Sequence, residues 1–245
     1  AHAVKTVSHL IQDDEKVLIL YGDVPLISDK TIQSLINSKS KCTLLSMILS
    51  DPTGYGRIVF DEKSFALKII EQKDASEEER NIKEVFSGIM MIDGSLLGPA
   101  LDEINNQNAA NEYYLTDLVE ILSAKGVKIN CIQANPTELL GANNKQELHE
   151  LESILREMSA EKLLEQGITL LDASRVDVRG EVEAGKDCSV DINVIFEGKV
   201  TLGENVTIKS NVVLSDVSIG DNSIIESFSH LSSALVGSNC NIGPY

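Results

Sequence analysis

The sequence has no tryptophan, few aromatic residues and no long apolar run. Aromatic side chains make up 4% of its 245 residues. A membrane-spanning helix needs about 18 or more consecutive apolar residues, and a secretory signal peptide has its own amino-terminal pattern. Because neither is present, we expect a cytoplasmic protein with no membrane insertion.

Basic residues are scarce beside acidic ones. The chain has 21 Lys and Arg against 38 Asp and Glu, which gives a net charge of -17. Nucleic-acid binding depends on Lys and Arg clusters that neutralise phosphates, so this composition argues against a nucleic-acid partner. A small anionic ligand stays compatible with it, provided that a divalent metal or backbone amides offset the repulsion.

Several motifs of metal binding and nucleophilic catalysis are also missing. The four cysteines lie far apart with no CxxC spacing, which predicts reduced thiols. The four histidines share no metal or triad spacing, and no GxSxG, Walker or HExxH motif occurs. Hydrolysis by a nucleophilic side chain therefore has no support in the sequence.

The carboxyl-terminal third contains a six-residue repeat of small apolar side chains. Such a period fits neither a helix nor a simple alternating strand and predicts a solenoid, in which three hexapeptides form one coil of a parallel β-helix. Ser218 and His230 break the rule. Glycines near the expected turns would supply positive φ angles. The repeat positions are Val176, Val182, Cys188, Val194, Val200, Val206, Val212, Ser218, Ile224, His230, Val236 and Ile242, and the glycines are Gly185, Gly203, Gly220, Gly237 and Gly243.

Residues 1–142 alternate helical and strand patterns, which predicts a layered α/β domain. The continuous apolar run 17–21 is typical of a strand buried on both faces of a mainly parallel sheet. Further strands are expected at 43–49, 57–60, 67–70, 88–92 and 127–133. Because the chain enters a helix pattern at Ala1 with no Met and no cap, we expect that it begins inside this domain.

A single amphipathic helix is predicted between the two regions. Asn144 with Glu147 resembles a capping box, and Gly167 is expected to end the helix. We therefore predict a partial α/β domain at 1–142, a helical linker at 143–167 and a partial β-helix at 168–245.

Asp23 is the strongest candidate for chemistry, because it directly follows the apolar strand pattern. Ligands of open α/β sheets bind at the carboxyl ends of strands, and a carboxylate there can hold Mg²⁺ against phosphate oxygens. The alternative is a turn aspartate that bonds its own backbone. The segment Gly54-Tyr55-Gly56 could expose backbone amides to a ligand, and the alternative is a plain turn. Glu71 follows another expected strand and is interpreted either as a carboxylate of the site or as a solvated charge.

The order of these segments resembles that of the bacterial bifunctional N-acetylglucosamine-1-phosphate uridyltransferase/glucosamine-1-phosphate acetyltransferase family. The segments that carry the resemblance are Tyr21-Gly22-Asp23-Val24-Pro25-Leu26, 51–58, 70–75, Glu112-Tyr113-Tyr114-Leu115-Thr116-Asp117 and Gly141-Ala142-Asn143-Asn144, followed by the hexapeptides. The resemblance implies a Rossmann-like nucleotidyltransferase domain (its carboxyl-terminal part) and the first coils of a left-handed β-helix.

The resemblance also implies a reaction and its residues. Uridylyl transfer from UTP to N-acetylglucosamine-1-phosphate would give UDP-N-acetylglucosamine, a precursor of peptidoglycan and lipopolysaccharide, and pyrophosphate, with Mg²⁺ as cofactor. Asp23 and Asn143 match metal ligands, Asp23 being the catalytic residue. The substrate-binding positions would be Tyr21, Gly22, Asp23, Gly56, Glu71, Tyr114, Thr116 and Asn143.

Three departures from the family pattern qualify this expectation. The amino-terminal glycine-rich loop that grips the triphosphate has no counterpart here, so we expect the isolated chain to be inactive. Phe86 stands where the family usually has a sugar-binding Asn. The acetyl-CoA site is expected to lie outside the chain. The resemblance also implies a homotrimer, because the β-helices of the family associate as trimers.

Two other interpretations stay open at this point. The chain is compatible with another sugar-nucleotide pyrophosphorylase that selects a different sugar or base. It is also compatible with a non-catalytic, pyrophosphorylase-like assembly subunit.

Overall fold

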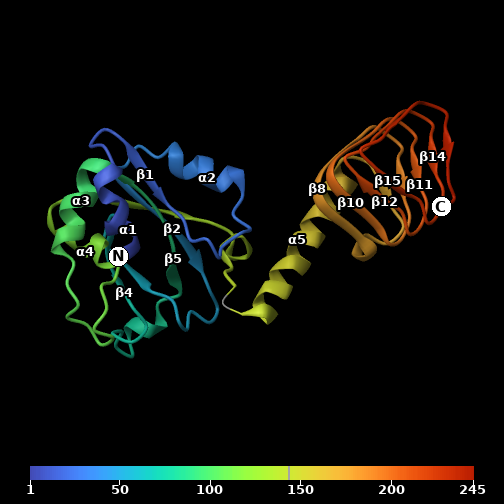
Figure 1. Ribbon diagram of the computed structural model, residues 1–245. Coiled ribbons are helices and arrows are strands. Elements are labelled where there is room, and N and C mark those ends of the chain that lie inside the picture. The colour runs from blue at the N-terminus through green and yellow to red at the C-terminus, as the bar shows by residue number, and fades with distance from the viewer. Residues whose placement is uncertain (143) are drawn as a thin grey trace. The chain divides into compact units, whose positions relative to one another are not determined.

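A computed structural model describes residues 1–142 and 144–245 of the chain (Figure 1). The chain divides into two compact units, Ala1–Asn143 and Asn144–Tyr245. The first is an α/β unit, and the second combines one long helix with stacked parallel strands. The predicted α/β domain, connecting helix and parallel β-helix are thus all present.

The α/β unit surrounds one six-stranded sheet with short helices (Figure 1). Its strands are β1 (Lys16–Ile19), β2 (Cys42–Ile48), β3 (Arg57–Phe60), β4 (Ala66–Ile70), β5 (Glu84–Asp93) and β6 (Ile129–Gln133). Its α-helices are α1 (His2–Val7), α2 (Asp29–Ile36), α3 (Gly94–Glu103) and α4 (Asp117–Ala124), and its 3-10 helices are η1 (Ser8–Leu10), η2 (Glu79–Asn81) and η3 (Pro136–Leu139).

The sheet is mixed, which corrects the expectation of a mainly parallel one. Its order is β4-β3-β5-β2-β6, with β1 also paired to β5. Strand β5 runs antiparallel to β1, β2 and β3, and only β2 with β6 forms a parallel pair. An apolar run carries no information about the direction of the neighbouring strands. Strand β1 is also shorter and less buried than the run 17–21 predicted, since it ends at Ile19 and both Leu20 and Tyr21 are 45% exposed.

Two apolar clusters lie on opposite faces of this sheet. Along β5, Phe86, Met90 and Ile92 join the cluster that contains α3 and α4. The alternate residues Ile89 and Met91 join the cluster that contains Leu35 of α2. Successive side chains of a strand point to opposite faces, so the two-residue period of β5 builds both halves of the core.

The helix ends follow the capping signals in the sequence. The Ser28 hydroxyl accepts a hydrogen bond from the Thr31 amide at 3.2 Å and begins α2. The Asn144 side chain accepts from the amide of Glu147 at 3.0 Å and begins the connecting helix, α5 (Lys145–Glu165). Gly167, with φ of 88°, follows its end. On the apolar side of this helix, Leu151 is buried, whereas Leu148 and Leu155 are exposed.

The second unit stacks short strands in parallel over the carboxyl-terminal part of α5. Leu163 and Ile168 pack into the coil interior, so the end of α5 covers the first coil. Besides η4 (Ala173–Arg175), the strands are β7 (Thr169–Leu170), β8 (Val176–Ala184), β9 (Ser189–Val190), β10 (Val194–Leu202), β11 (Thr207–Ile208), β12 (Val213–Ser215), β13 (Ser218–Ile219), β14 (Ile224–Ile225), β15 (His230–Ser232), β16 (Leu235–Val236) and β17 (Asn241–Ile242).

The coils change length part-way along the stack, which corrects the repeat frame. Asn193 and Asn211 occupy equivalent corners 18 residues apart, whereas Asn205 and Asn222 are 17 residues apart. Because the shorter coil has one residue fewer, the residue that follows Val212 in the interior row is Val217, five positions later and 1% exposed. The interior row then continues through Ser223 and Ser229, both buried, with Ala234 and Cys240 partly buried. Ser218 and His230, the apparent breaks, lie on the outside.

Gly185, Gly203 and Gly220 lie against the backbone of the next coil, which corrects their expected role as positive-φ residues. Of the five glycines expected near the turns, only Gly243 has a positive φ, and asparagines such as Asn193 and Asn205 take the left-handed corners. A Cβ on Gly185 would lie 2.8 Å from the carbonyl carbon of Gly203 in the next coil. Asparagine tolerates the left-handed region, so glycine is needed only where neighbouring backbones approach.

Candidate functional site

The α/β unit contains a pocket of about 430 Å³ beside β5, lined by residues that follow β1 and β4. Segments that are far apart in the sequence meet there. Among the residues named from the sequence, those that line it are Tyr21, Asp23, Gly56, Glu71 and Thr116. The other lining residues are Val24, Gly54, Tyr55, Phe86, Ser87, Gly88, Leu139 and Gly141.

Glu71 and Thr116 form the polar wall of the pocket. The buried Thr116 hydroxyl donates a hydrogen bond of 2.8 Å to Oε1 of Glu71, which orients the carboxylate. A Cβ on Gly56 would lie 2.6 Å from Cγ2 of Ile69 and 3.6 Å from Oε1 of Glu71. Glycine at position 56 therefore allows the backbone to pack directly against Ile69, beside the oriented carboxylate of Glu71.

Tyr21 and Gly88 form another part of the lining. Gly88 has φ of 89° in the middle of β5, and a Cβ there would lie 2.4 Å from Cε2 of Tyr21. The aromatic ring therefore lies against bare backbone. Burial raises the pKa of the Tyr21 hydroxyl above its ordinary value, and the nearby charges of Glu71 and Asp23 raise it further.

Asp23 lies at the pocket mouth, where the chain leaves β1. Its backbone carbonyl accepts a hydrogen bond of 3.1 Å from the Ala142 amide, which joins the segment after β1 to the segment before α5. Its carboxylate is exposed, and within the described part of the chain no hydrogen bond reaches it. An exposed carboxylate without a protein donor suits a hard cation that also takes phosphate and water oxygens. The described residues hold no group of three or more acidic, His or Cys ligands.

The remaining predicted positions lie around this pocket. Gly22 and Tyr114 are not among the described lining residues. The pKa of the Tyr114 hydroxyl is raised by burial first, then by the charge of Asp74 and then by that of Glu71. Asn143, predicted as a metal and substrate ligand, lies outside the described residues.

Sequence reasoning missed Ser87, Gly88 and Leu139 as pocket residues. The Ser87 hydroxyl donates to the Leu45 carbonyl at 2.8 Å, which ties the pocket floor to β2. A glycine inside an apolar strand pattern is a signal of close approach, and Gly88 carried that signal. Leu139 belongs to a separate 3-10 helix and had no signal of its own.

Among the described residues, the lining contains two carboxylates and no Lys, Arg or His. Arg57 lies just outside: it is 1% exposed, it donates a hydrogen bond to the Tyr55 carbonyl, and its Nε has no partner in the described structure. Its contact with Tyr55 fixes the backbone between Gly54 and Gly56.

The described residues include no helix with the length and apolar content needed to cross a bilayer.

Comparison with known proteins identifies relatives of the whole chain. The bifunctional protein GlmU of Idiomarina loihiensis is 44% identical over 247 aligned residues, covering 100% of this chain and 54% of that protein. The GlmU proteins of Burkholderia multivorans and Methylococcus capsulatus are each 42% identical, with the same coverage. The resemblance to the bifunctional GlmU family is confirmed.

The chain spans about half the length of the curated GlmU relatives that it matches. No protein-family model matches it. One solved structure, described as a putative glucose-1-phosphate thymidylyltransferase from Bacillus anthracis in complex with a sucrose, aligns with 63% of this chain and 59% of its own. That alignment has 17% identity and a TM-score of 0.46, too low to support a conclusion about this chain.

Proposed function

We propose that the α/β unit is part of a nucleotidyltransferase that moves the uridylyl group of UTP onto N-acetylglucosamine-1-phosphate. The observation that carries this proposal is the meeting of Asp23, Gly56, Glu71 and Thr116 in one pocket. Similarity to GlmU proteins along the whole chain supports the same assignment.

In this reaction a phosphate oxygen of the sugar phosphate bonds to the α-phosphorus of UTP. The bond from that phosphorus to the bridging oxygen breaks, and pyrophosphate leaves. No side chain has to form a covalent intermediate, so the protein contributes positioning and charge neutralisation. This agrees with a pocket that has neither a cysteine nor a histidine in its lining.

The residues of the pocket have distinct parts in this chemistry. Glu71, held by Thr116, would accept hydrogen bonds from sugar hydroxyl groups. Tyr21 would pack against the ligand, and the bare backbone at Gly56 would let it approach the sheet edge. Asp23, with Asn143, would hold Mg²⁺, which supplies neutralisation of phosphate charge when bound.

Asp23→Ala in the full-length protein tests the proposal. We expect pyrophosphate release from UTP and N-acetylglucosamine-1-phosphate to fall by about 10³-fold, because a metal contact of several kcal/mol is lost. Its Mg²⁺ dependence should weaken as well. Asp14→Asn, which removes an exposed acid in the turn before β1, is the matched control. Near-normal rates for Asp23→Ala would remove Asp23 from the metal site.

Phe86 favours a second candidate, a pyrophosphorylase for a different sugar. It is 5% exposed and lines the pocket beside Ser87, where it presents an apolar surface. A panel of sugar phosphates in the same pyrophosphate assay separates the two candidates. Preference for N-acetylglucosamine-1-phosphate supports the first, and a higher kcat/KM with another sugar supports the second.

For the second unit, we propose that the coils belong to an acetyltransferase half and associate as a homotrimer. The parallel stack of apolar hexapeptides supports this assignment. A light-scattering mass equal to one full-length chain would contradict it.

A further inference from the structure

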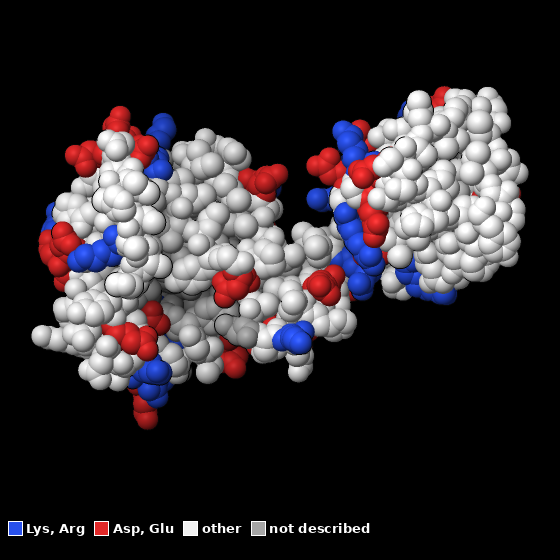
Figure 2. All heavy atoms as spheres, viewed as in Figure 1, with Lys and Arg blue, Asp and Glu red and all other residues white. Residues whose placement is uncertain are grey.

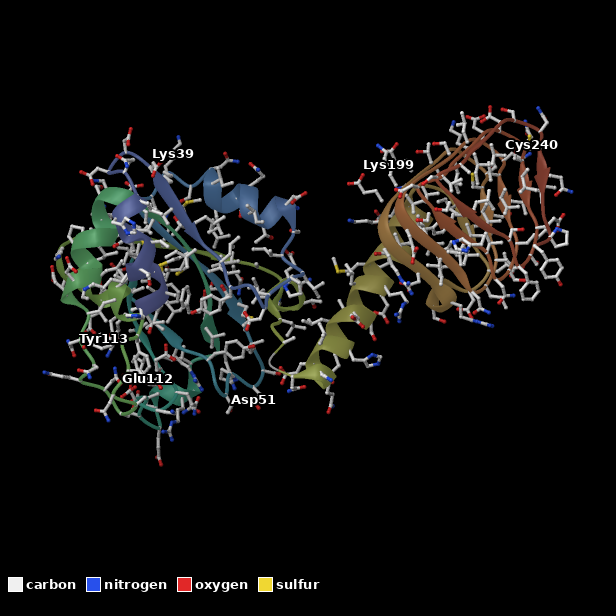
Figure 3. The ribbon with its side chains drawn as sticks, viewed as in Figure 1. Lys39, Asp51, Glu112, Tyr113, Lys199 and Cys240 are labelled. Atoms are coloured by element: carbon white, nitrogen blue, oxygen red, sulfur yellow. The ribbon has the colours of Figure 1, made fainter. Side chains whose placement is uncertain are left out.

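The α/β unit has a second hollow that the proposed reaction does not use. It encloses about 630 Å³, and its lining includes Lys39, Lys41, Lys125 and Lys128 but no Asp or Glu. Cations therefore gather at one place in a chain whose net charge is -17. In Figure 3, Lys39 lies at one end of the α/β unit and Asp51 at the other.

Strand directions place this hollow at the opposite edge of the sheet from the first pocket. Lys41 and Lys128 stand directly before Cys42 and Ile129, the paired first residues of β2 and β6. The first pocket lies instead beyond the end of β1, and β1 and β2 both run antiparallel to β5. The basic hollow is thus at the amino-terminal ends of these strands.

The backbone holds these lysines close together. The Ser40 hydroxyl donates to the carbonyls of Cys42 and Lys128 at 2.8 and 2.9 Å, and so joins the two strand ends. Paired strands lie about 4.8 Å apart, and like charges placed opposite each other are destabilising. This arrangement has an electrostatic cost for the folded protein that a bound anion would offset.

Most of these ammonium groups lack a carboxylate partner. Lys125 is paired with Glu103. Lys128 lies over the ring of Phe65, 5.5 Å from its centroid, and in the described structure Lys39 and Lys41 have no ion pair. Asn130 adds a half-buried side-chain amide without a hydrogen-bond partner among the described residues.

We propose that this hollow is a binding site for a small phosphate-bearing anion. Lysines bind phosphate as point charges, and three of the four here are not neutralised by a carboxylate. The volume is in the range of small-molecule sites, about 300–1,000 Å³. At physiological ionic strength, salt screens charges that lie more than about 8 Å away. A small anion in the hollow is therefore attracted mainly by these lysines, whereas a long polyanion is also repelled by the acidic surface of the protein.

Calorimetric titration of the intact chain with inorganic pyrophosphate, in Mg²⁺-free buffer, tests this site. The test variant is Lys39→Gln with Lys41→Gln. The matched control is Lys186→Gln with Lys209→Gln, which removes two exposed, unpaired lysines from the coil unit. We expect the test variant to bind at least about tenfold more weakly, the effect of losing one charged hydrogen bond, and the control to bind as the parent does.

Salt and ligand chemistry sharpen the test. Binding should weaken between about 0.01 M and about 0.15 M salt, as the Debye length shortens from about 30 Å to about 8 Å. Asp23→Ala should leave it unchanged, so the outcome is separate from that of the proposed reaction. Adenosine monophosphate as a second probe shows whether a base adds affinity beside Phe65.

Several outcomes would overturn the proposal. No heat with either phosphate compound, or an equal loss in both double variants, would show that there is no specific phosphate site. Binding of a polyglutamate peptide without binding of pyrophosphate would assign the hollow to an acidic protein segment instead.

Discussion

The coil unit and the α/β unit build their interiors over different distances along the chain. In the coils, equivalent corners such as Asn193 and Asn211 are 18 residues apart, and each coil repeats the same contacts with the next. In the α/β unit, the hydrogen bond between Thr116 and Glu71 spans 45 residues. A repeated core can therefore be inferred from spacing, whereas a pocket formed by distant segments depends on the topology of the sheet.

Polar and charged side chains are also distributed differently in the two units. Figure 2 shows charged side chains on the coil unit gathered at one end of the stack, with a largely uncharged face beyond them. On the coil unit, Arg179 forms ion pairs with Asp177 of its own strand, β8, and with Glu197 of the neighbouring strand β10. In the α/β unit, by contrast, like charges lie close together: after burial, the charges of Glu120, Glu71 and Asp74 raise the pKa of Asp117. Each of the following predictions tests one side of this comparison.

The largest expected effect is on the stacking of the coils. Gly185→Ala places a Cβ 2.8 Å from backbone atoms of Gly203 and Glu204, which cannot move independently of their coil. We expect a loss of about 2–3 kcal/mol in the free energy of unfolding of the coil unit, as for overpacking of a core. Urea unfolding, with hydrogen exchange of coil peptides, measures it.

Gly237→Ala is the matched control for this variant. It occupies an equivalent coil position, but a Cβ there would have only Cys240 Sγ nearby, at 3.9 Å. It should therefore leave stability almost unchanged. Equal losses in the two variants would show that close packing between coils is not the reason for glycine at position 185.

The second prediction concerns the pocket of the α/β unit. Gly88→Ala and Gly54→Ala introduce the same left-handed strain, since their φ angles are 89° and 90°. Only at Gly88 does the new Cβ also meet the ring of Tyr21. We expect both to lose about 1 kcal/mol from backbone strain, and Gly88→Ala to lose up to about 1 kcal/mol more.

Ligand affinity separates these two effects further. Gly88→Ala should displace Tyr21 and weaken binding of the nucleotide sugar more than Gly54→Ala does, as measured by calorimetry. If the two variants have the same stability and affinity, Tyr21 does not depend on the bare backbone of Gly88.

The smallest expected effect is a local response to pH. Burial, followed by the charges of Glu120, Glu71 and Asp74, raises the pKa of Asp117 from 3.8 to about 6. The folded state then holds this proton more tightly than the unfolded state, so the contribution of Asp117 to stability is highest below about pH 4 and declines as pH rises to about 6. Asp117→Asn should remove part of this decline.

Urea midpoints between these pH values measure the response. Asp13→Asn, which changes an exposed acid without a bonding partner, should keep the parental pH dependence. Hydrogen exchange in the coil peptides should be the same in Asp117→Asn and the parent. An unchanged pH dependence in Asp117→Asn would contradict the assignment.

Much of the fold followed from local patterns. The apolar runs predicted the six strands of the sheet, and Ser28, Asn144 and Gly167 marked helix ends where the structure has them. The change of frame at Val217 also had a sequence signal, because an apolar residue stands immediately before Ser218. The strict six-residue count missed it, since a coil can lose one residue at a corner.

The candidate site was predictable only in part. Asp23, Glu71 and Gly56 could be named because glycine and carboxylates at strand ends are signals by themselves. The contact of Tyr21 with Gly88 joins β5 to the segment after β1, and no local pattern indicates that pairing. Nor does spacing bring Lys41 beside Lys128, which depends on the register of β2 with β6.

The sequence by itself determined the division into an α/β unit, a helix and a repeated stack, because hydrophobic periodicity and capping act within a few residues. It also specified which residue types were available for binding. Tertiary structure alone decided the mixed strand directions and which side chains share a pocket. These depend on pairing between segments remote in the chain, where the free energy comes from burial and hydrogen bonding of both partners together.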